Sequence, residues 1–536
     1  SSNLHVGAGI TMYGASGIVS ATSFYGNGQN LTNLISGKIS GLTVKDEGST
    51  VGTAGSVGSI NFVGGGVVAT AAGAGATITI SGFGEDAQGN LYAGTDAGAA
   101  SDADTFYNIA LGKCAGAALN SGDYNVFLGC YAGKGVTSGS QNVSIGLAAG
   151  CCRQSGINNI AIGFETLKGD TSTPSNNSGS TNIGVGVYAG FKLTTGAANV
   201  FIGGNAGCKL TTGSYNIGIG CLALGTGTVT GPDNIALGRE SARSLTSGYQ
   251  NVFIGCKAGY YSSGNAYSVF IGNSAGYHND SGNDNVFIGN YAGCGSNVGT
   301  INAGCNAAIG YGAGRNLTTG TFNTFMGKDA GMCISTGTEN IAFGCSALKG
   351  SSTTGNNTGT NNIALGQNAG RSITSAGFNI MIGKCAGCTL QTGMNNTYIG
   401  LQAGELANAT YANTAVGRRA HCAHTTGNYN SMFGAGAGRN HTSGSYNVAI
   451  GNNVCLPNAV GNSQLAIGCD QDYWIVGNAN WNVGIGTTNP DTAVGAGNTA
   501  KLSVGIVSAY QLYGDGTNLT GVGWSPDAQY NLAAGT

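Results

Sequence analysis

The chain has 536 residues, including 100 Gly and only 5 Pro, and its net charge is −2. Glycine at this level without a Gly-X-Y period excludes collagen, and a hydrophobic fraction of 41% is too high for a disordered linker. The near balance of acidic and basic residues excludes the basic surface that nucleic acid selects. No apolar run reaches the roughly 18 residues of a membrane span, so we expect none. The chain opens without a signal peptide or an initiator Met, and we interpret it as a fragment of a longer protein.

The first two segments are predicted to be small β elements. Residues 1-35 are expected to form a linker or β segment. Residues 36-83 are rich in Val, Ile, Thr and Gly and contain alternating runs such as ATITISG, which predicts a small all-β insert.

Residues 84-470 contain a repeat of 17 residues. Its consensus is N-h-x-h-G-x-x-A-G-x-x-[LVI]-[TS]-x-G-x-x, where h is Val, Ile or Leu, and 22 units begin between Asn90 and Gln464. Alternation of h at places two and four is the period of a strand, and 17 residues are too few for a βαβ unit. We therefore predict an all-β, fibrous chain: a parallel β-solenoid or β-roll of about 22 coils, roughly 100 Å long at the strand spacing of ~4.8 Å.

The first place of the repeat is Asn in 20 of the 22 units, the exceptions being Ser268 and Gln464. Stacked coils would set these side chains above one another, so we predict a hydrogen-bonded ladder of side-chain amides, with a ligand-binding row as the alternative. We name the following as ladder residues: Asn108, Asn125, Asn142, Asn159, Asn199, Asn251, Asn285, Asn379 and Asn447.

The third place of the repeat is often aromatic. If places two and four face the interior, place three points outward, and a single coil would expose an aromatic stripe of the kind that marks an interface. We predict that this stripe is buried between subunits of a homotrimer or filament, the alternatives being a carbohydrate-binding stripe and a monomeric roll with a well-filled interior. The stripe comprises Phe127, Phe201, Phe253, Phe270, Phe287, Phe325 and Tyr398.

Sixteen Cys invite a disulfide or metal interpretation. No place of the repeat has Cys in two successive coils, which excludes a vertical disulfide ladder. Cross-column pairs such as Cys208 with Cys221 stay open, and we expect mostly free thiols. The Cys385-Ala-Gly-Cys388 run crosses a corner without a βαβ unit, so no redox role is expected. His421, Cys422 and His424 offer three donors where a zinc site needs four, so we expect no metal.

No Ser, His and Asp recur together, and no Gly-rich run carries the Lys-Ser/Thr that holds nucleotide. We therefore expect no enzyme activity and no cofactor. The longer steps between units add residues 170–181, 294–305 and 349–360, all after the Ala-Gly corner. These segments should protrude from one edge, either as binding loops or as tolerated insertions.

The array carries a resemblance to a known family. NVAIG at 447–451, NIAIG at 159–163 and NIALG at 108–112 resemble the N-S-V-A-I-G repeat of the head domains of trimeric autotransporter adhesins. That resemblance implies a left-handed parallel β-roll and a trimer. The flanking runs FYGNGQNLTNL (24–34) and LYGDGTNLTGV (512–522) are similar to segments of bacteriophage virion and tail-fibre proteins, particularly those of marine cyanobacterial phages.

A longer repeat encloses the array. Residues 17–32 match 505–520, and EDAQGNLYAGT (85–95) matches PDAQYNLAAGT (526–536). We therefore expect residues 471-523 to be a linker or β segment that repeats 1-35, and residues 524-536 to start a next array. Cassettes of this kind would build an extended filament.

Together these observations predict a structural fibre protein of a virion, in a tail or capsid fibre, whose partners are further copies of itself and a glycan or protein of the host surface. The alternative is a bacterial cell-surface adhesin or extracellular filament with a trimeric β-roll head. A fibre-bound glycan hydrolase is a third class, for which the repeat supplies no carboxylate pair. The expected location is the virion, or the cell surface under the alternative.

Overall fold

The computed structural model describes residues 85–172, 177–295, 302–351, 357–486, 488 and 490, together with seven short strands within residues 1–84. The chain divides into two units, Ser1–Gly84 and Glu85–Thr536. The expected linker over 471-523 is described only as far as residue 490, and the expected array start at 524-536 lies outside the described residues.

The first unit contains short antiparallel β elements. β1 (Leu4–His5), β2 (Ile10–Tyr13) and β3 (Ile18–Ala21) form a three-stranded sheet within residues 1-35. Within residues 36-83, two antiparallel pairs follow: β4 (Lys45–Asp46) with β5 (Ser49–Thr50), and β6 (Val67–Ala72) with β7 (Gly75–Ile80).

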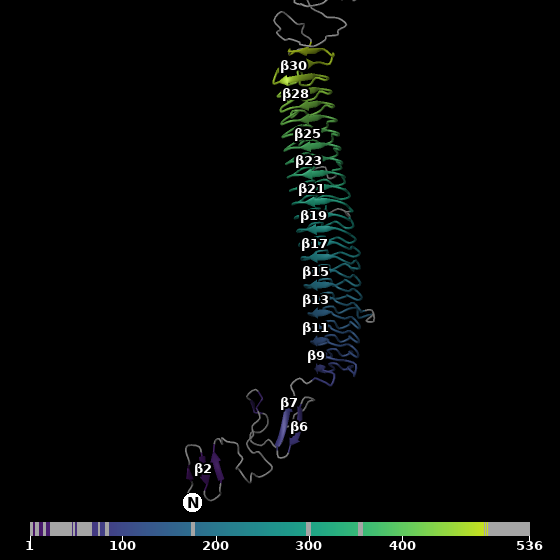
Figure 1. The fold of residues 1–536 in the computed structure, drawn as a ribbon, viewed down its shortest axis with the longest axis vertical. Helices are drawn as coiled ribbons and strands as arrows, with labels where there is room; N and C mark the ends of the chain where they lie inside the picture. Colours follow the sequence, from purple (N-terminus) through teal and green to yellow (C-terminus); the bar gives the residue numbers. More distant parts are fainter. Residues whose placement is uncertain are drawn as a thin grey trace, which may run out of the picture. The chain divides into compact units, whose positions relative to one another are not determined.

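The second unit is a column of coils, each carrying one short strand (Figure 1). Successive strands from β8 to β29 pair in parallel, with residues of one place facing the same place of the next coil, as Phe253 faces Phe270. The described residues contain no helix. The predicted parallel β-solenoid is therefore confirmed.

These strands have the following bounds: β8 Leu91–Ala93, β9 Ile109–Leu111, β10 Val126–Leu128, β11 Val143–Ile145, β12 Ile160–Ile162, β13 Ile183–Val185, β14 Val200–Ile202, β15 Ile217–Ile219, β16 Ile235–Leu237, β17 Val252–Ile254, β18 Val269–Ile271, β19 Val286–Ile288, β20 Ala307–Ile309, β21 Thr324–Met326, β22 Ile341–Phe343, β23 Ile363–Leu365, β24 Ile380–Ile382, β25 Thr397–Ile399, β26 Thr414–Val416, β27 Ser431–Phe433, β28 Val448–Asn452 and β29 Leu465–Cys469.

The direction of pairing changes at the C-terminal end of the array. β29 pairs antiparallel with β30 (Asp472–Gly477), and β30 pairs antiparallel with β31 (Val483–Ile485). The register shifts between Ile467 and Gly468 where this hairpin begins. The parallel stack therefore ends at β29.

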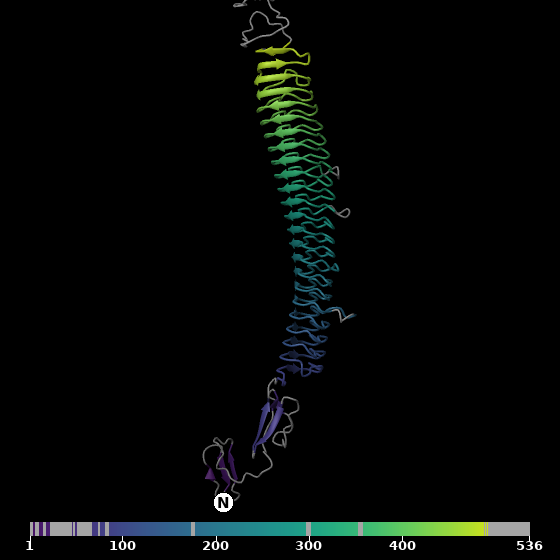
Figure 2. The same cartoon turned by 45° about the vertical axis from the view of Figure 1, so that its right-hand side comes forward.

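The strands occupy one side of the column and the turns occupy the other (Figure 2). Backbone hydrogen bonds join successive coils on both sides. On the strand side Val126 N donates to Asn142 O at 2.8 Å, and on the turn side Gly133 N donates to Ala149 O at 2.8 Å. Turns and strands therefore share the same coil-on-coil spacing.

Glycine fills place five in every coil because two constraints meet there. At Gly129, φ is +127°, and a Cβ atom would lie 2.8 Å from the carbonyl oxygen of Gly146 in the next coil. A side chain would strain the backbone and also push the two coils apart. Places seven and seventeen also adopt positive φ in each coil, although most residues there are not glycine, as with Tyr124 at 57° and Tyr131 at 61°. The glycine pattern alone did not predict these two corners.

The interior is lined by places one, three, eight and twelve, which corrects one prediction. The third-place side chains Phe127, Phe201, Phe253, Phe270, Phe287, Phe325 and Tyr398 are 0% exposed within a single chain. The interpretation of this column as an outward stripe buried between subunits is therefore wrong. Period two puts place three on the same side as the first-place Asn, so the aliphatic places two and four face outward.

Places three and nine exchange volume inside the coil. Beside Phe127, a Cβ on Gly133 at place nine would lie 2.4 Å from the ring. Among the coils that begin between Asn90 and Asn447, six have a residue larger than glycine at place nine, and each of them has Ala or Gly at place three. These pairs are Leu167 with Ala161, Leu224 with Gly218, Ala242 with Ala236, Leu348 with Ala342, His421 with Ala415, and Cys455 with Ala449. Coils with small residues at both places are filled from their neighbours: a Cβ on Gly190, in the coil of Gly184, would lie 2.5 Å from Leu167 and 2.9 Å from Phe201.

We predict that the large residue can be moved from place three to place nine in the coil of Phe127 and Gly133. Phe127→Ala should cost about 3–5 kcal/mol because it leaves a cavity, and Gly133→Leu should destabilise because the side chain meets the ring. The double variant should be more stable than the sum of the two changes implies, by a coupling energy of roughly 0.5–3 kcal/mol. A double-mutant cycle of denaturant unfolding measures this term, and strict additivity would contradict it.

Candidate functional site

The predicted ladder residues form a buried chain of amides through the stack. At Asn323, Nδ2 donates to Asn306 Oδ1 at 3.0 Å and to Gly337 O at 2.9 Å. Its Oδ1 accepts from Asn340 N and Asn340 Nδ2, both at 3.0 Å. Every hydrogen-bonding position of this amide is filled by protein, so no donor is left for a ligand. This geometry is that of the structural ladder, and it excludes the ligand-binding row at this residue.

The named ladder residues share this placement and are at most 5% exposed: Asn108, Asn125, Asn142, Asn159, Asn199, Asn251, Asn285, Asn379 and Asn447. Ser268 replaces Asn within the ladder. Its Oγ accepts from Asn285 N at 3.3 Å, so the backbone bond survives, whereas the side-chain contact between Asn251 and Asn285 does not form.

The ladder has distinct ends. At the first coil, Asn90 N donates to Asp86 Oδ1 at 2.8 Å and Asn90 Nδ2 donates to Asp86 Oδ2 at 3.1 Å, so a carboxylate replaces the missing amide. At the last coil, the side chain of Gln464 folds back, with Nε2 donating to Asn458 O at 2.8 Å. It is directed toward the turn of the preceding coil, and the ladder stops.

We predict that Asn323→Ala destabilises its coil by roughly 2–5 kcal/mol, because it orphans the buried Asn340 N–H and Gly337 C=O. Asn323→Ser should cost less, since the hydroxyl keeps the backbone bond as Ser268 does. Hydrogen exchange of the coils around residues 306–340 measures the loss. The control is Asn290→Ala, an exposed Asn outside the ladder, and equal effects of Asn323→Ala and this control would contradict the ladder.

All sixteen cysteines are free. Cys385 and Cys388 lie at the corner without a disulfide, and Cys208 and Cys221 are not joined. Cys151 and Cys152 have sulfurs 3.1 Å apart. The hydrogen bond from Cys151 lowers the pKa of Cys152 to about 7, whereas that same contact raises the pKa of Cys151.

Two inserted segments are anchored by equivalent asparagines that the sequence interpretation missed. Asn177 Nδ2 donates to Cys152 O and to Asp170 O, both at 2.8 Å. Asn357 Nδ2 donates to Cys333 O at 2.7 Å and to Ser351 O at 3.0 Å. Each is the second Asn of an Asn-Asn-[Ser/Thr]-Gly run and lies five residues before a ladder residue. This shared pattern in the sequence would have indicated an equivalent role for the two asparagines. Residues 173–176, 296–301 and 352–356, the centres of the three expected protrusions, lie outside the described residues.

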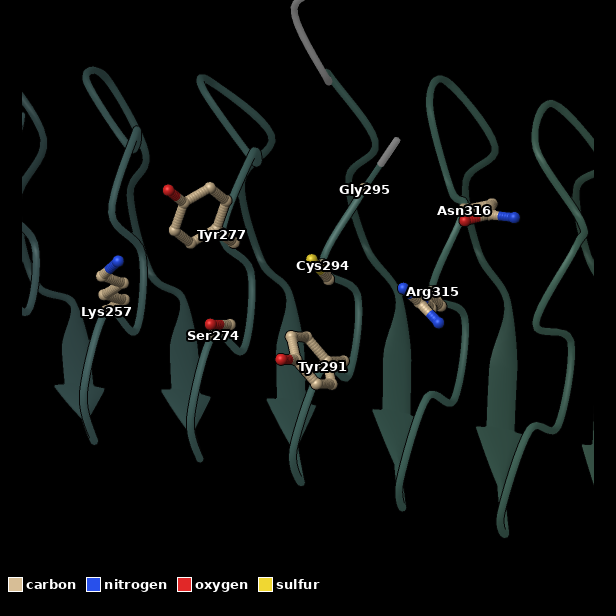
Figure 3. A pocket seen from close by; sticks show the side chains of 8 residues that line it. All are labelled: Lys257, Ser274, Tyr277, Tyr291, Cys294, Gly295, Arg315 and Asn316. Atoms are coloured by element: carbon tan, nitrogen blue, oxygen red, sulfur yellow. The ribbon is translucent and has the colours of Figure 1, made fainter. Parts of the chain in front are cut away.

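A surface hollow of about 400 Å³ lies on the turn side of the coils that begin at residues 251–306. Figure 3 shows Tyr277, Tyr291, Lys257 and Arg315 around it. The Arg315 guanidinium lies 5.4 Å from the centre of the Tyr291 ring, and Lys257 Nζ is 3.8 Å from Glu240. Such a surface could hold an anionic group beside a flat ring.

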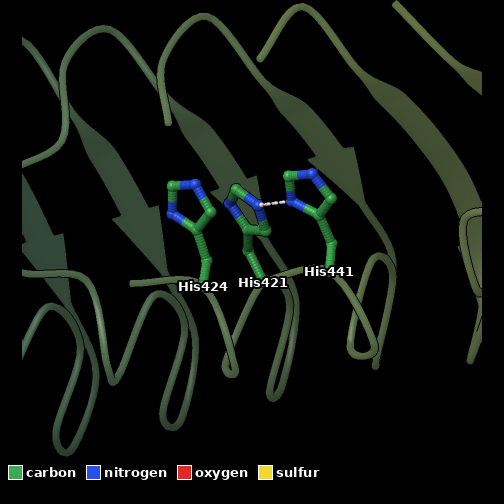
Figure 4. A group of neighbouring side chains, drawn as sticks. All are labelled: His421, His424 and His441. Carbon is green, nitrogen blue, oxygen red and sulfur yellow. Dashed lines mark hydrogen bonds between the residues drawn. The ribbon is translucent and has the colours of Figure 1, made fainter. Parts of the chain in front are cut away.

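The most unusual group is three histidines inside the core. His421, His424 and His441 are each 0% exposed and project from neighbouring turns into the same part of the interior (Figure 4). One nitrogen from each ring lies within 4.8 Å of the others. The His421 and His424 rings stack with centroids 3.8 Å apart. Cys422, which the sequence grouped with them, is at an intermediate depth and is not part of this cluster.

Two contacts orient the His441 ring. Its Nε2 lies 3.0 Å from Asn447 Nδ2, and its Nδ1 lies 2.9 Å from His421 Nε2, so one proton is shared between these two rings. His421 Nδ1 and both ring nitrogens of His424 are buried without a hydrogen-bond partner. Three ring nitrogens of the cluster are therefore left without a hydrogen bond.

Burial keeps all three imidazoles neutral. It lowers the pKa of His424 to about 3 and lowers the pKa of His441. It also lowers the pKa of His421 well below the ordinary value, and the neighbouring rings of His424 and His441 add to the effect. A charge on any ring would lie in an apolar interior without a carboxylate in the cluster.

Since the unfolded chain binds protons near pH 6.5 and the folded cluster does not, this segment should be fully stable above pH 6.5 and lose stability as the pH falls toward 3. The expected loss is about 1.4 kcal/mol per pH unit for each histidine that stays neutral. Hydrogen exchange of residues 413–463 between pH 7.5 and 4.5 measures it. His424→Leu should reduce the slope, whereas His278→Asn, outside the cluster, should not, and a slope unchanged by His424→Leu would contradict the assignment.

Sequence reasoning found two of the three histidines. His441 was missed, although it follows His424 by 17 residues and therefore occupies the same twelfth place one coil later. Leu119, Leu193 and Leu390 occupy this place in other coils. A polar residue in a column of buried Leu was the available signal.

Comparisons with protein-family models, curated proteins and solved structures found no match to this chain. Among the described residues there is no helix with the length and apolar character that crossing a bilayer requires.

Proposed function

We propose that this chain is a structural fibre protein in which parallel copies pack side by side through the outer face of the strand column. The observation that carries the proposal is the composition of this face. Place four is aliphatic or aromatic in every coil from Leu111 to Ile467, and neither place two nor place four holds a charged residue. We call these two columns the strand face.

Side chains of the strand face are partly exposed to solvent, and residues of the same column in the adjacent coils cover the rest. A side chain within a stack is flanked above and below by its own column, yet Ile202, Phe343, Phe433 and Ile450 remain 39–42% exposed. Twenty-two strands at ~4.8 Å with two columns about 10 Å wide give on the order of 1,000 Å² per chain, more than the ~800 Å² per partner of a standard interface. An apolar patch of this size favours burial.

A second copy of the chain fits this surface better than another partner would. The face repeats with each coil, so side chains can interdigitate along its whole length only with a surface of the same axial period. A parallel copy supplies that period. Packing of two copies also requires no complementary charges, because the strand face contains no charged residue. Three copies per fibre is the number that the resemblance to trimeric heads implies.

The virion assignment rests on the flanking cassettes. The runs at 24–34 and 512–522 are similar to bacteriophage fibre segments. The described residues of the array between them assemble no catalytic group. We infer that the array is a passive spacer or shaft of a virion fibre, with a bacterial surface filament as the alternative. Antibodies raised against residues 85–486 should decorate fibres of intact virions, and labelling confined to a bacterial envelope would favour the alternative.

We predict that lysines on the strand face dissociate the assembly. Ile219→Lys with Ile399→Lys would bury two unpaired charges between copies, so native mass spectrometry should show single chains where the wild type shows three. The control pair is Tyr261→Lys with Leu406→Lys, which places the same charge on exposed turn-side residues and should leave the trimer intact. A wild-type chain that is monomeric, or a control pair that dissociates equally, would contradict the proposal.

A further inference from the structure

The histidine cluster has the donors of a metal site and lacks partners for them. Three imidazoles converge in the core, and three of their ring nitrogens have no hydrogen bond. Leaving a buried polar atom unpaired costs about 1–3 kcal/mol, so the cluster is unfavourable as an element of packing alone. Leucine fills the same place in other coils at no such cost, as Leu390 does.

We propose that His421, His424 and His441 bind one late first-row transition-metal ion, of the Zn²⁺ class, inside the solenoid. Neutral imidazole is the ligand that these ions accept, and the cluster contains no carboxylate or thiolate that would favour Ca²⁺, Mg²⁺ or a thiolate site. The three histidines leave a fourth position for water. Loss of a proton from that water would lower the charge that the core must hold.

The rings must move to form this site. A bound ion lies in the plane of each imidazole, whereas His424 is stacked on His421 with an angle of 19° between their planes. Three nitrogens about 2.0–2.1 Å from a tetrahedral ion lie roughly 3.4 Å apart, so the present span of up to 4.8 Å has to close. Side-chain rotation of His424, without a change in the backbone, moves its nitrogens in the required direction.

The surrounding core provides room for that rotation. Place three holds Phe or Tyr in many coils. In the two coils that carry the histidines it is Ala415 and Met432, and in the following coil it is Ala449. Methionine is unbranched and adapts to an altered neighbour. His441 is already oriented by Asn447 through its Nε2, which leaves Nδ1 directed toward the cluster. A neutral His441 that binds the ion through Nδ1 carries its proton on Nε2, and the backbone of Gly461, a hydrogen-bond partner of this ring, supplies the outer acceptor that metal-bound histidines usually have.

The experiment is a Co²⁺ titration of the full chain after dialysis against chelator, followed by competition with Zn²⁺. We expect one ion per chain, visible-range absorption typical of tetrahedral Co²⁺, and loss of that absorption when Zn²⁺ is added. His424→Leu and His441→Leu should each weaken binding by at least the roughly 10–100-fold that loss of an outer-shell partner costs. His278→Asn is the matched control and should bind like the wild type.

Hydrogen exchange of residues 413–463 supplies a readout that separates binding from folding. Zn²⁺ should slow exchange there in the wild type and in His278→Asn, and should have no effect in His424→Leu. Both leucine variants place in the column a residue that it already holds elsewhere, and their exchange without metal reports whether the coils fold. Absence of binding to the wild type, or binding retained in both leucine variants, would overturn the proposal.

Discussion

The coil-on-coil spacing is the constraint on which the rest of the molecule depends. Two columns of residues set this spacing: the first-place asparagines and the place-five glycines. The amide ladder requires each Oδ1 to lie within hydrogen-bond distance of the next coil, as at 2.9 Å between Asn125 N and Asn108 Oδ1. The place-five glycines allow the backbones to approach that closely, because a Cβ there would meet the carbonyl of the next coil. The amide ladder holds successive coils together by hydrogen bonds, and the place-five glycines avoid the steric clash that would keep the coils apart.

The interior and the exterior then follow different rules. Inside, each large residue at place three occurs with glycine at place nine, and coils that are small at both places are filled by side chains of adjacent coils. Outside, places two and four vary among Val, Ile, Leu, Met, Phe, Ala, Thr and Ser without a compensating partner in the same coil. Among the described residues, the histidine cluster and the buried Arg153 replace apolar volume at place twelve by groups that require a partner, and both retain unpaired nitrogens. A regular repeat makes such a departure visible without any related sequence.

The period of the repeat was sufficient to predict the fold. One strand per unit, the parallel register and the buried amide column all follow from 17-residue spacing. The direction in which the strand faces did not follow from hydrophobicity, because Val and Ile at places two and four are as apolar as the Phe and Ala at place three. The amide column held the answer: Asn125 and Phe127 are two residues apart and must share a face. The histidine site was half predicted, since His441 adjoins His424 only across coils.

Asp86 gives the array a direction of growth. Each ladder amide accepts hydrogen bonds from the coil that follows it, so a new coil needs a finished one below, and the carboxylate of Asp86 supplies the first acceptor before any coil exists. Nearly all contacts join residues about one repeat apart, which keeps the loop-closure entropy of each addition small. A chain that leaves the ribosome from its N-terminus can therefore fold as it is made, one coil behind synthesis, with no need to wait for its distant end. Growth ends at Gln464, because its side-chain amide bonds to Asn458 of the preceding coil and offers no acceptor to a further coil.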